Sequence, residues 1–178
     1  ADQHIDLKLN TSVTAIDPAT RNVTLRDGSV IPCDRLLLAT GAEPVRLSLP
    51  GIDLPHVHTL RTLADSRAII ARAASAKSAV VMGASFIGLE VAASLRARGV
   101  EVHVVAPGKH PMERVLGAGL GDFIRALHEE HGVIFHLEQT ATAIDADRVT
   151  LQDGSRVAAT LVVAGVGVRP RLSLAQDA

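Results

Sequence analysis

Hydrophobic and polar residues follow a strand–turn–helix–strand pattern in the middle of the chain, at residues 78–106 (SAVVMGASFIGLEVAASLRARGVEVHVVA). The apolar runs at 79–82 and 102–105 have the length of strands. Between them, apolar residues recur at helical spacing, namely Ile87, Val91 and Leu95. Gly99 then supplies the residue type that commonly ends a helix. The pattern predicts a βαβ unit.

The turn between the first strand and the helix consists of small residues. Gly83, Ser85 and Gly88 occupy the positions of the G-x-G-x-x-G fingerprint, with serine in place of the second glycine. The first glycine permits the tight turn, and the third lets the helix and the strand pack closely. A pyrophosphate would face free N–H groups at the positive end of the helix. A dinucleotide site is predicted, and glycines that merely pack a helix on a strand are the alternative.

Apolar runs elsewhere predict further strands. Ile5, Leu7 and Leu9 alternate with polar neighbours, and residues 36–38 form a fully apolar run that leads into Ala39-Thr40-Gly41. The other predicted strands are residues 13–17, 23–25, 30–31, 133–137, 141–145, 149–151 and 161–164.

Composition also predicts helices and a connection. Helices are expected at residues 62–76 and from about residue 119 to 131, where Gly132 ends the second one. Residues 41–55 are rich in proline and glycine and are expected to be a linker or crossover.

The last third of the chain repeats the first. TAIDPATRNVTLRDGSVIPCDRLLLATGAEP matches TAIDADRVTLQDGSRVAATLVVAGVGVRP, and Val23 corresponds to Val149, an offset of 126 residues. In the same register, Gly41 corresponds to Gly167. A constant register over about 20 positions argues against a chance similarity of two hairpins. We therefore expect one unit twice, an antiparallel meander followed by an apolar strand that ends in glycine.

Composition excludes several classes of function. The 178 residues carry a formal net charge of −1, which argues against a general surface for nucleic acid or an anionic membrane. The chain has no tyrosine, which excludes any mechanism that needs a catalytic tyrosine. Its one cysteine, Cys33, excludes an internal disulfide and a C-x-x-C redox pair. No membrane span and no signal-peptide layout are predicted, so we expect a cytoplasmic protein.

The motifs together resemble the FAD-dependent pyridine nucleotide–disulfide oxidoreductase superfamily, and most of all its ferredoxin-reductase and apoptosis-inducing-factor-like members. LLLATGAEP, LPHVHTLRTLADSRAI, VVMGASFIGLEVAASL and VVAGVGVRP carry the resemblance along almost the whole chain. Such proteins insert an NAD(P)H domain into an FAD domain. The resemblance implies a partial FAD-domain meander and strand at residues 1–43, an NAD(P)H-binding domain at 44–168, and the start of a return to the FAD domain at 169–178.

The expected fold class is α/β. We predict a Rossmann-like, three-layer nucleotide-binding domain with a central parallel sheet and an antiparallel β-meander, together with a second, partial meander at the N-terminus. Residues 1–43 would expose apolar strand edges, which leaves a homodimer as one open possibility.

The resemblance also implies the cofactor-binding residues. The glycine turn would hold the pyrophosphate, and Phe86 and Ile87 would begin the helix beside it, with core packing as their alternative. Glu90 would approach the nicotinamide carboxamide, the alternative being a charge near the helix N-terminus. The full set from these segments is Gly83, Ala84, Ser85, Phe86, Ile87, Gly88, Glu90, Gly165, Val166, Gly167, Thr40 and Gly41. The triplet 165–167 would meet the nicotinamide half, and Thr40-Gly41 would lie at the edge of the FAD domain.

Preference between NAD(H) and NADP(H) stays open. Ala106 stands where NADH-using relatives usually have glutamate, and a ribose 2′-OH needs such an acid. Lys109, His110 and Arg114 follow, and any of them could face a 2′-phosphate, with a solvated loop charge as the alternative. Glu113 could serve the ribose instead, and we favour NADH.

The resemblance implies hydride transfer from NAD(P)H to FAD, followed by single-electron delivery to a ferredoxin or Rieske-type iron–sulfur partner. No side chain of this chain is expected to be catalytic, and the chain alone is expected to be inactive and to bind no FAD. The alternatives are a non-catalytic, nucleotide-sensing Rossmann module and a methyltransferase. The methyltransferase fold requires an acidic residue at the position of Ala106, which argues against it. His56 and His58 are expected to be surface residues rather than metal ligands.

Overall fold

The computed structural model describes residues 4–178. The chain forms two compact units: residues up to Glu43 join Pro170–Ala178 in the smaller one, and Pro44–Arg169 make up the larger one. β4 (Ala42–Pro44) and β13 (Val168–Pro170) form a two-stranded sheet.

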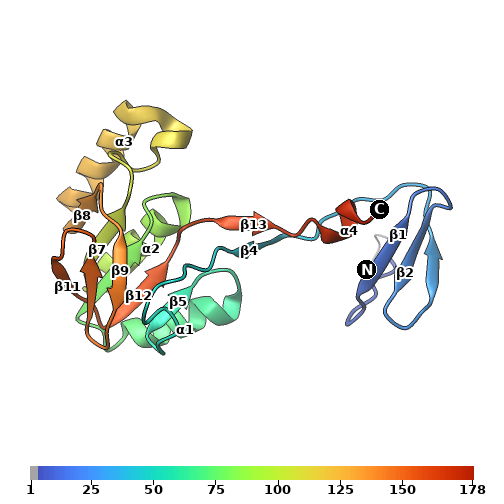
Figure 1. The fold of residues 1–178 in the computed structure, drawn as a ribbon, viewed down its shortest axis with the longest axis horizontal. Coiled ribbons are helices and arrows are strands. Elements are labelled where there is room, and N and C mark those ends of the chain that lie inside the picture. Colours follow the sequence, from blue (N-terminus) through green and yellow to red (C-terminus); the bar gives the residue numbers. More distant parts are fainter. Residues whose placement is uncertain (1–3) are drawn as a thin grey trace. The chain divides into compact units, whose positions relative to one another are not determined.

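A parallel sheet forms the centre of the larger unit (Figure 1). Its order is β5-β12-β6-β7-β8, so β12, late in the sequence, pairs with the much earlier β5 and β6. The bounds are β5 (Val57–Thr59), β12 (Leu161–Ala164), β6 (Ser78–Met82), β7 (Glu101–Ala106) and β8 (Val133–Leu137). Every residue of β6 and β12 is buried, as expected for parallel strands that are covered on both faces.

Two helices cover one face of this sheet. α1 (Leu63–Ala73) begins with a capping box, in which Thr62 and Asp65 exchange side-chain and backbone hydrogen bonds. α2 (Phe86–Arg96) follows the glycine turn. The shared core contains Ile69 and Ala73 of α1, Val91, Ala92 and Leu95 of α2, and Ala79, Val81, Val102, Val104, Leu161 and Val163 of the sheet.

An antiparallel meander covers the opposite face. Its order is β11-β10-β9, formed by β9 (Ala141–Ile144), β10 (Arg148–Leu151) and β11 (Arg156–Ala158). Val149 and Leu151 of β10 are fully buried in a second core with Val80 and Val162 of the sheet. Helices, parallel sheet and meander make three layers, which confirms the predicted α/β fold.

α3 (Glu113–Glu130) begins earlier than the predicted residue 119. Gly117 interrupts the helix with a φ of 77° and a ψ of 171°, so that a single turn precedes the longer segment. The glycines at 117, 119 and 121 lower helix propensity in this region, which is why the first turn was missed.

The smaller unit contains the other meander. β1 (Val13–Asp17), β2 (Asn22–Leu25) and β3 (Val30–Pro32) pair antiparallel in the order β1-β2-β3, and α4 (Ser173–Gln176) is a short helix. β2 and β3 are offset from β10 and β11 by the same 126 residues that relate Val23 to Val149. The structure therefore confirms the internal repeat.

Two predicted strands were wrong. Residues 5–9 and 36–38 form no strand in the described chain, and their apolar side chains are exposed, with Leu37 at 88%. A strand needs a neighbour for its backbone hydrogen bonds, and no described segment pairs with either run. The prediction missed β4, β5, β11, β13 and α4, which have only three or four residues each.

Candidate nucleotide-binding site

The turn after β6 depends on backbone contacts that only glycine permits. Gly83 has a φ of 109°, and a Cβ at this residue would lie 2.5 Å from the carbonyl oxygen of Gly165. A Cβ on Gly88 would overlap the carbonyl oxygen of Gly83. Gly165 makes a less severe but still tight contact, because a Cβ there would be 3.2 Å from Gly88 Cα. The three glycines therefore bring the ends of β6 and β12 against the first turn of α2.

Backbone hydrogen bonds hold this turn in place. The Gly83 N–H donates to the Val105 carbonyl at 2.8 Å, and the Gly165 N–H donates to the Met82 carbonyl at 2.8 Å. Ser85 is the N-cap of α2, and its side chain makes no capping bond to any described residue. The first N–H groups of the helix have no partner within the helix and form its positive end. This arrangement suits an anion.

The turn opens into a groove of about 800 Å³ within the larger unit. This volume falls within the range of about 300–1,000 Å³ typical of small-molecule sites. Five segments form its wall with the glycine turn: residues 47–49, 105–108 with His110, 112–115, 139–141 and 165–167. Most of them follow the carboxyl ends of parallel strands, where ligands of open α/β sheets bind.

The groove brings together eight of the predicted cofactor-binding residues: Gly83, Ala84, Ser85, Ala106, Arg114, Gly165, Val166 and Gly167. Gly88 is buried behind the turn, where its role is the close contact with Gly83. Ile87 packs against the core beneath α2, and the Phe86 side chain is 61% exposed.

The remaining predicted residues lie elsewhere. Glu90 lines a separate cavity of about 240 Å³ between α1 and α2, together with Ser66 and Arg98. Lys109 is exposed, and it is not among the described residues that line the groove. Thr40 and Gly41 belong to the smaller unit, where the Thr40 hydroxyl donates to the Arg171 carbonyl at 2.7 Å and the Arg171 N–H donates to the Gly41 carbonyl at 3.0 Å.

Sequence reasoning missed several residues of the groove. Gln139 and Thr140 follow β8, and their position after a parallel strand could have indicated them. Met112 adopts a left-handed conformation with a φ of 58°, and its N–H donates to the Ala84 carbonyl at 2.9 Å. This bond ties the start of α3 to the glycine turn.

Ala106 ends β7 in the wall of the groove, with only 5% of its surface exposed. Its methyl group offers no acceptor for a ribose hydroxyl. The charged and ionisable side chains of this part of the wall are His110, Glu113 and Arg114. The fit to a nicotinamide dinucleotide rests on the small-residue turn, the open helix N-terminus and the size of the groove.

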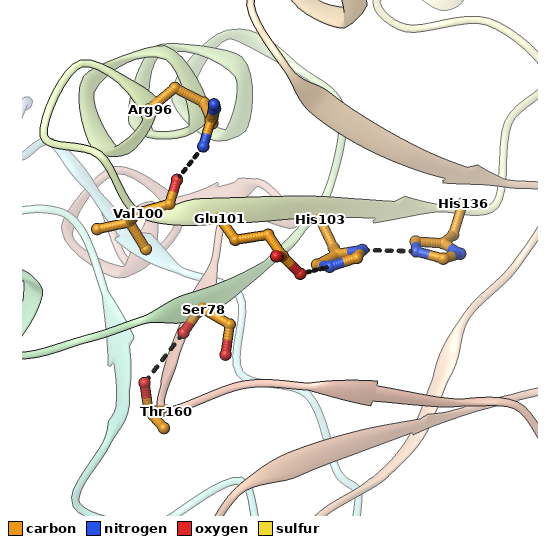
Figure 2. A network of polar contacts seen from close by, with 7 residues as sticks. All are labelled: Ser78, Arg96, Val100, Glu101, His103, His136 and Thr160. Carbon is orange, nitrogen blue, oxygen red and sulfur yellow. Dashed lines mark hydrogen bonds and ion pairs between the residues drawn. The ribbon is translucent and has the colours of Figure 1, made fainter.

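A polar network lies on the meander face of the sheet, outside the residues that line the groove. Figure 2 shows His103 between Glu101 and His136, with 2.9 Å between His103 Nε2 and Glu101 Oε1, and 3.0 Å between His103 Nδ1 and His136 Nε2. Burial lowers the pKa of His136, the neighbouring His103 lowers it further, and Asp153 opposes both. The network joins β7 to β8.

His56 and His58 are not surface residues, so that expectation was wrong. His56 is 5% exposed, and the Nε2 atoms of both rings are buried without a hydrogen-bond partner in the described chain. Burial, with a smaller contribution from Arg72, lowers the pKa of both imidazoles. His58 belongs to β5, at the edge of the parallel sheet, and His56 lies in the turn just before it, where its carbonyl accepts a hydrogen bond from the Val162 N–H at 2.9 Å. No group of three or more potential metal-ligating side chains occurs in residues 4–178.

The family model for pyridine nucleotide-disulphide oxidoreductases matches residues 1–178. The chain belongs to this family. Rhodocoxin reductase of Rhodococcus erythropolis is 41% identical over 179 residues, which cover 98% of this chain and 42% of the relative. The ferredoxin–NAD(+) reductase component of the biphenyl dioxygenase system of Paraburkholderia xenovorans (strain LB400) is 36% identical over 182 residues, covering 100% of this chain and 45% of the relative.

Among solved structures of the family, the ferredoxin reductase for the CYP199A2 system from Rhodopseudomonas palustris superposes with a TM-score of 0.86 at 38% identity. The match covers 93% of this chain and 42% of that chain. The chain thus spans less than half the length of these curated relatives. In residues 4–178, no helix is both long enough and apolar enough to span a bilayer.

Proposed function

We propose that this chain is the nicotinamide-nucleotide-binding part of an FAD-dependent NAD(P)H oxidoreductase. In this proposal residues 44–168 bind the coenzyme, residues 1–43 contribute a meander and a strand to an FAD domain, and residues 169–178 begin the return to it. The observation that carries the proposal is the contact of Gly83, Gly88 and Gly165 beneath an uncapped helix N-terminus that opens into the groove. The family membership supports the redox class.

The residues of the groove have binding and orienting roles. The first N–H groups of α2 would hold the pyrophosphate, and the small residues Ala84 and Ser85 would let it approach the backbone. Residues 165–167, at the end of β12, would lie along the nicotinamide half. The nicotinamide supplies a hydride for the flavin when both cofactors are bound. We therefore assign no acid, base or nucleophile to this chain.

The proposal also names a class of redox partner. Relatives that include a ferredoxin–NAD(+) reductase component favour a ferredoxin or Rieske-type iron–sulfur acceptor. A homodimer and a cytoplasmic location belong to the same proposal. A full-length protein that reduces a ferredoxin with NAD(P)H would support the partner, and reduction of oxygen alone would count against it.

Ser85→Asp tests the pyrophosphate site without relying on a loss of folding. Aspartate is as good an N-cap as serine and is favoured at the positive helix end, so the thermal midpoint should stay equal or rise. Its charge should repel the pyrophosphate and weaken NADH binding, measured by calorimetry, by tenfold or more, which is about 1.4 kcal/mol. Ser85→Asn is the neutral control of the same size and should bind within about twofold of the original chain.

The same calorimetry separates the alternative functions. NADH or NADPH should bind, and S-adenosylmethionine should not, if the groove belongs to an oxidoreductase. Equal affinity of the Ser85→Asp and Ser85→Asn variants for NADH would place the pyrophosphate elsewhere and end the proposal. A nucleotide-sensing module would bind NADH in the same way, but its full-length protein would not reduce a bound flavin.

A further inference from the structure

His110 is held from two sides in the wall of the groove. Its Nδ1 lies 2.5 Å from Asp122 Oδ1 of α3. Gly121 packs against the same loop so closely that a Cβ there would lie 2.6 Å from the Pro111 carbonyl oxygen and 2.8 Å from His110 Cβ. These contacts fix an imidazole that is 26% exposed and that lines the groove.

This position matters because of the residue at the end of β7. A dinucleotide site commonly places an acid there to bind the adenosine ribose, or an arginine nearby to bind a 2′-phosphate. Ala106 can do neither, and the charged or ionisable side chains of this part of the wall are His110, Glu113 and Arg114. Glu113 and Arg114 are exposed, long and opposite in charge, and ordering them would cost side-chain entropy. His110 is already positioned.

We propose that His110, oriented by Asp122, reads the 2′ position of the bound coenzyme, and that its protonation state sets the preference between NADH and NADPH. The proposal rests on the proposed function of the groove. Since Asp122 accepts the Nδ1 proton, Nε2 is left for the ligand. In the neutral ring Nε2 is an acceptor and suits a 2′-hydroxyl. In the protonated ring it is a donor with a positive charge and suits a 2′-phosphate.

The charged groups around His110 come from three elements. Lys109 lies on the same loop as His110, and α3 carries Asp122, Glu113 and Arg114. Glu138 follows β8, and its N–H donates to the Gly108 carbonyl at 3.2 Å. Carboxylates, lysine and arginine ordinarily titrate outside pH 6–8, whereas histidine titrates within it. The coenzyme's 2′-phosphate, a phosphate monoester, also titrates near pH 6. It gains a proton at lower pH, which opposes the effect of His110.

The test is calorimetric titration of the chain with NADH and NADPH at pH 6 and pH 8. The affinity ratio of NADPH to NADH should be about tenfold larger at pH 6 than at pH 8. In His110→Gln the ratio should instead stay level or fall towards pH 6, because only the phosphate titrates. Asp122→Asn should reduce the pH response. Lys109→Gln, the matched control on the same loop, should keep it.

A second readout needs no variant. The side-chain NMR resonances of His110 should titrate at a higher pH with NADPH bound than with NADH bound. An equal titration with both coenzymes, or a pH response that survives His110→Gln, would overturn the proposal while leaving coenzyme binding intact. Absence of binding for both coenzymes would instead be a failure of the proposed function.

Discussion

The two copies of the internal repeat start from similar sequences and end in different environments. Both form a three-stranded meander with the same turn. The Leu25 N–H donates to the Ser29 carbonyl at 2.8 Å, and the corresponding Leu151 N–H donates to the Ser155 carbonyl at 2.8 Å. Gly28 and Gly154 have the same φ of 85°. The meander therefore forms in both units from pairings between residues that are close in sequence.

The strand after the meander differs between the copies. Val163 is fully buried in β12, between β5 and β6, whereas the corresponding Leu37 is 88% exposed and belongs to no strand. A parallel strand obtains its partners from distant segments, because a crossover must separate them. The comparison shows that an apolar run forms a parallel strand only where neighbouring strands are available to pair with it.

The largest expected effect comes from placing the same residue at the two matched positions. Val163→Thr puts a hydroxyl into the core and should lower the free energy of unfolding by about 1–3 kcal/mol. Leu37→Thr, at the exposed position, should change it by less than about 0.5 kcal/mol. Urea unfolding followed by circular dichroism is the suitable measurement, because the chain has no tryptophan or tyrosine. A similar loss in both variants would show that residues 36–38 are packed in solution.

The sequence predicted those parts of the fold that depend on local patterns. The βαβ unit and both meanders followed from periodicity, glycine turns and the repeated register. Residues 5–9 and 36–38 were predicted as strands because they have strand periodicity, and periodicity says nothing about a partner. β5 was missed because its three residues, VHT, show too few positions for a pattern.

The site could be predicted only in part, for a related reason. The glycine turn has a sequence signature, and its members Gly83, Ala84 and Ser85 do line the groove. Glu90, which the family resemblance places near the coenzyme, lines the cavity between α1 and α2, and its role stays a prediction. Met112 enters the wall through a left-handed backbone conformation, for which a methionine side chain carries no signal.

A smaller effect is expected at the two matched turn glycines. Gly28→Ala and Gly154→Ala should each cost about 1 kcal/mol, since both residues have a positive φ and, among the described atoms, a Cβ would meet nothing within 4 Å at either. Amide hydrogen exchange at Leu25 and Leu151 reports each turn separately, and the two protection losses should agree within about twofold. A clearly larger loss at Leu151 would mean that packing on the sheet, and not the turn, determines the second meander.

The smallest effect concerns pH and should occur in the larger unit alone. Because burial and His103 lower the pKa of His136, the folded state binds fewer protons than the unfolded state just below about pH 6.5, the ordinary histidine value. Stability should therefore fall as the pH drops through this window.

The smaller unit has no comparable buried histidine among residues 4–43, and Asp27, whose pKa is lowered by bonds from Ser29, responds only in more acidic solution. Hydrogen exchange at pH 7.5 and 5.5 should show lost protection in β7 and β8 but not in β2. His136→Gln should reduce this loss, and the part that remains should come from His56 and His58, whose pKa values burial also lowers. Equal losses in both units would assign the pH response to a group other than His136.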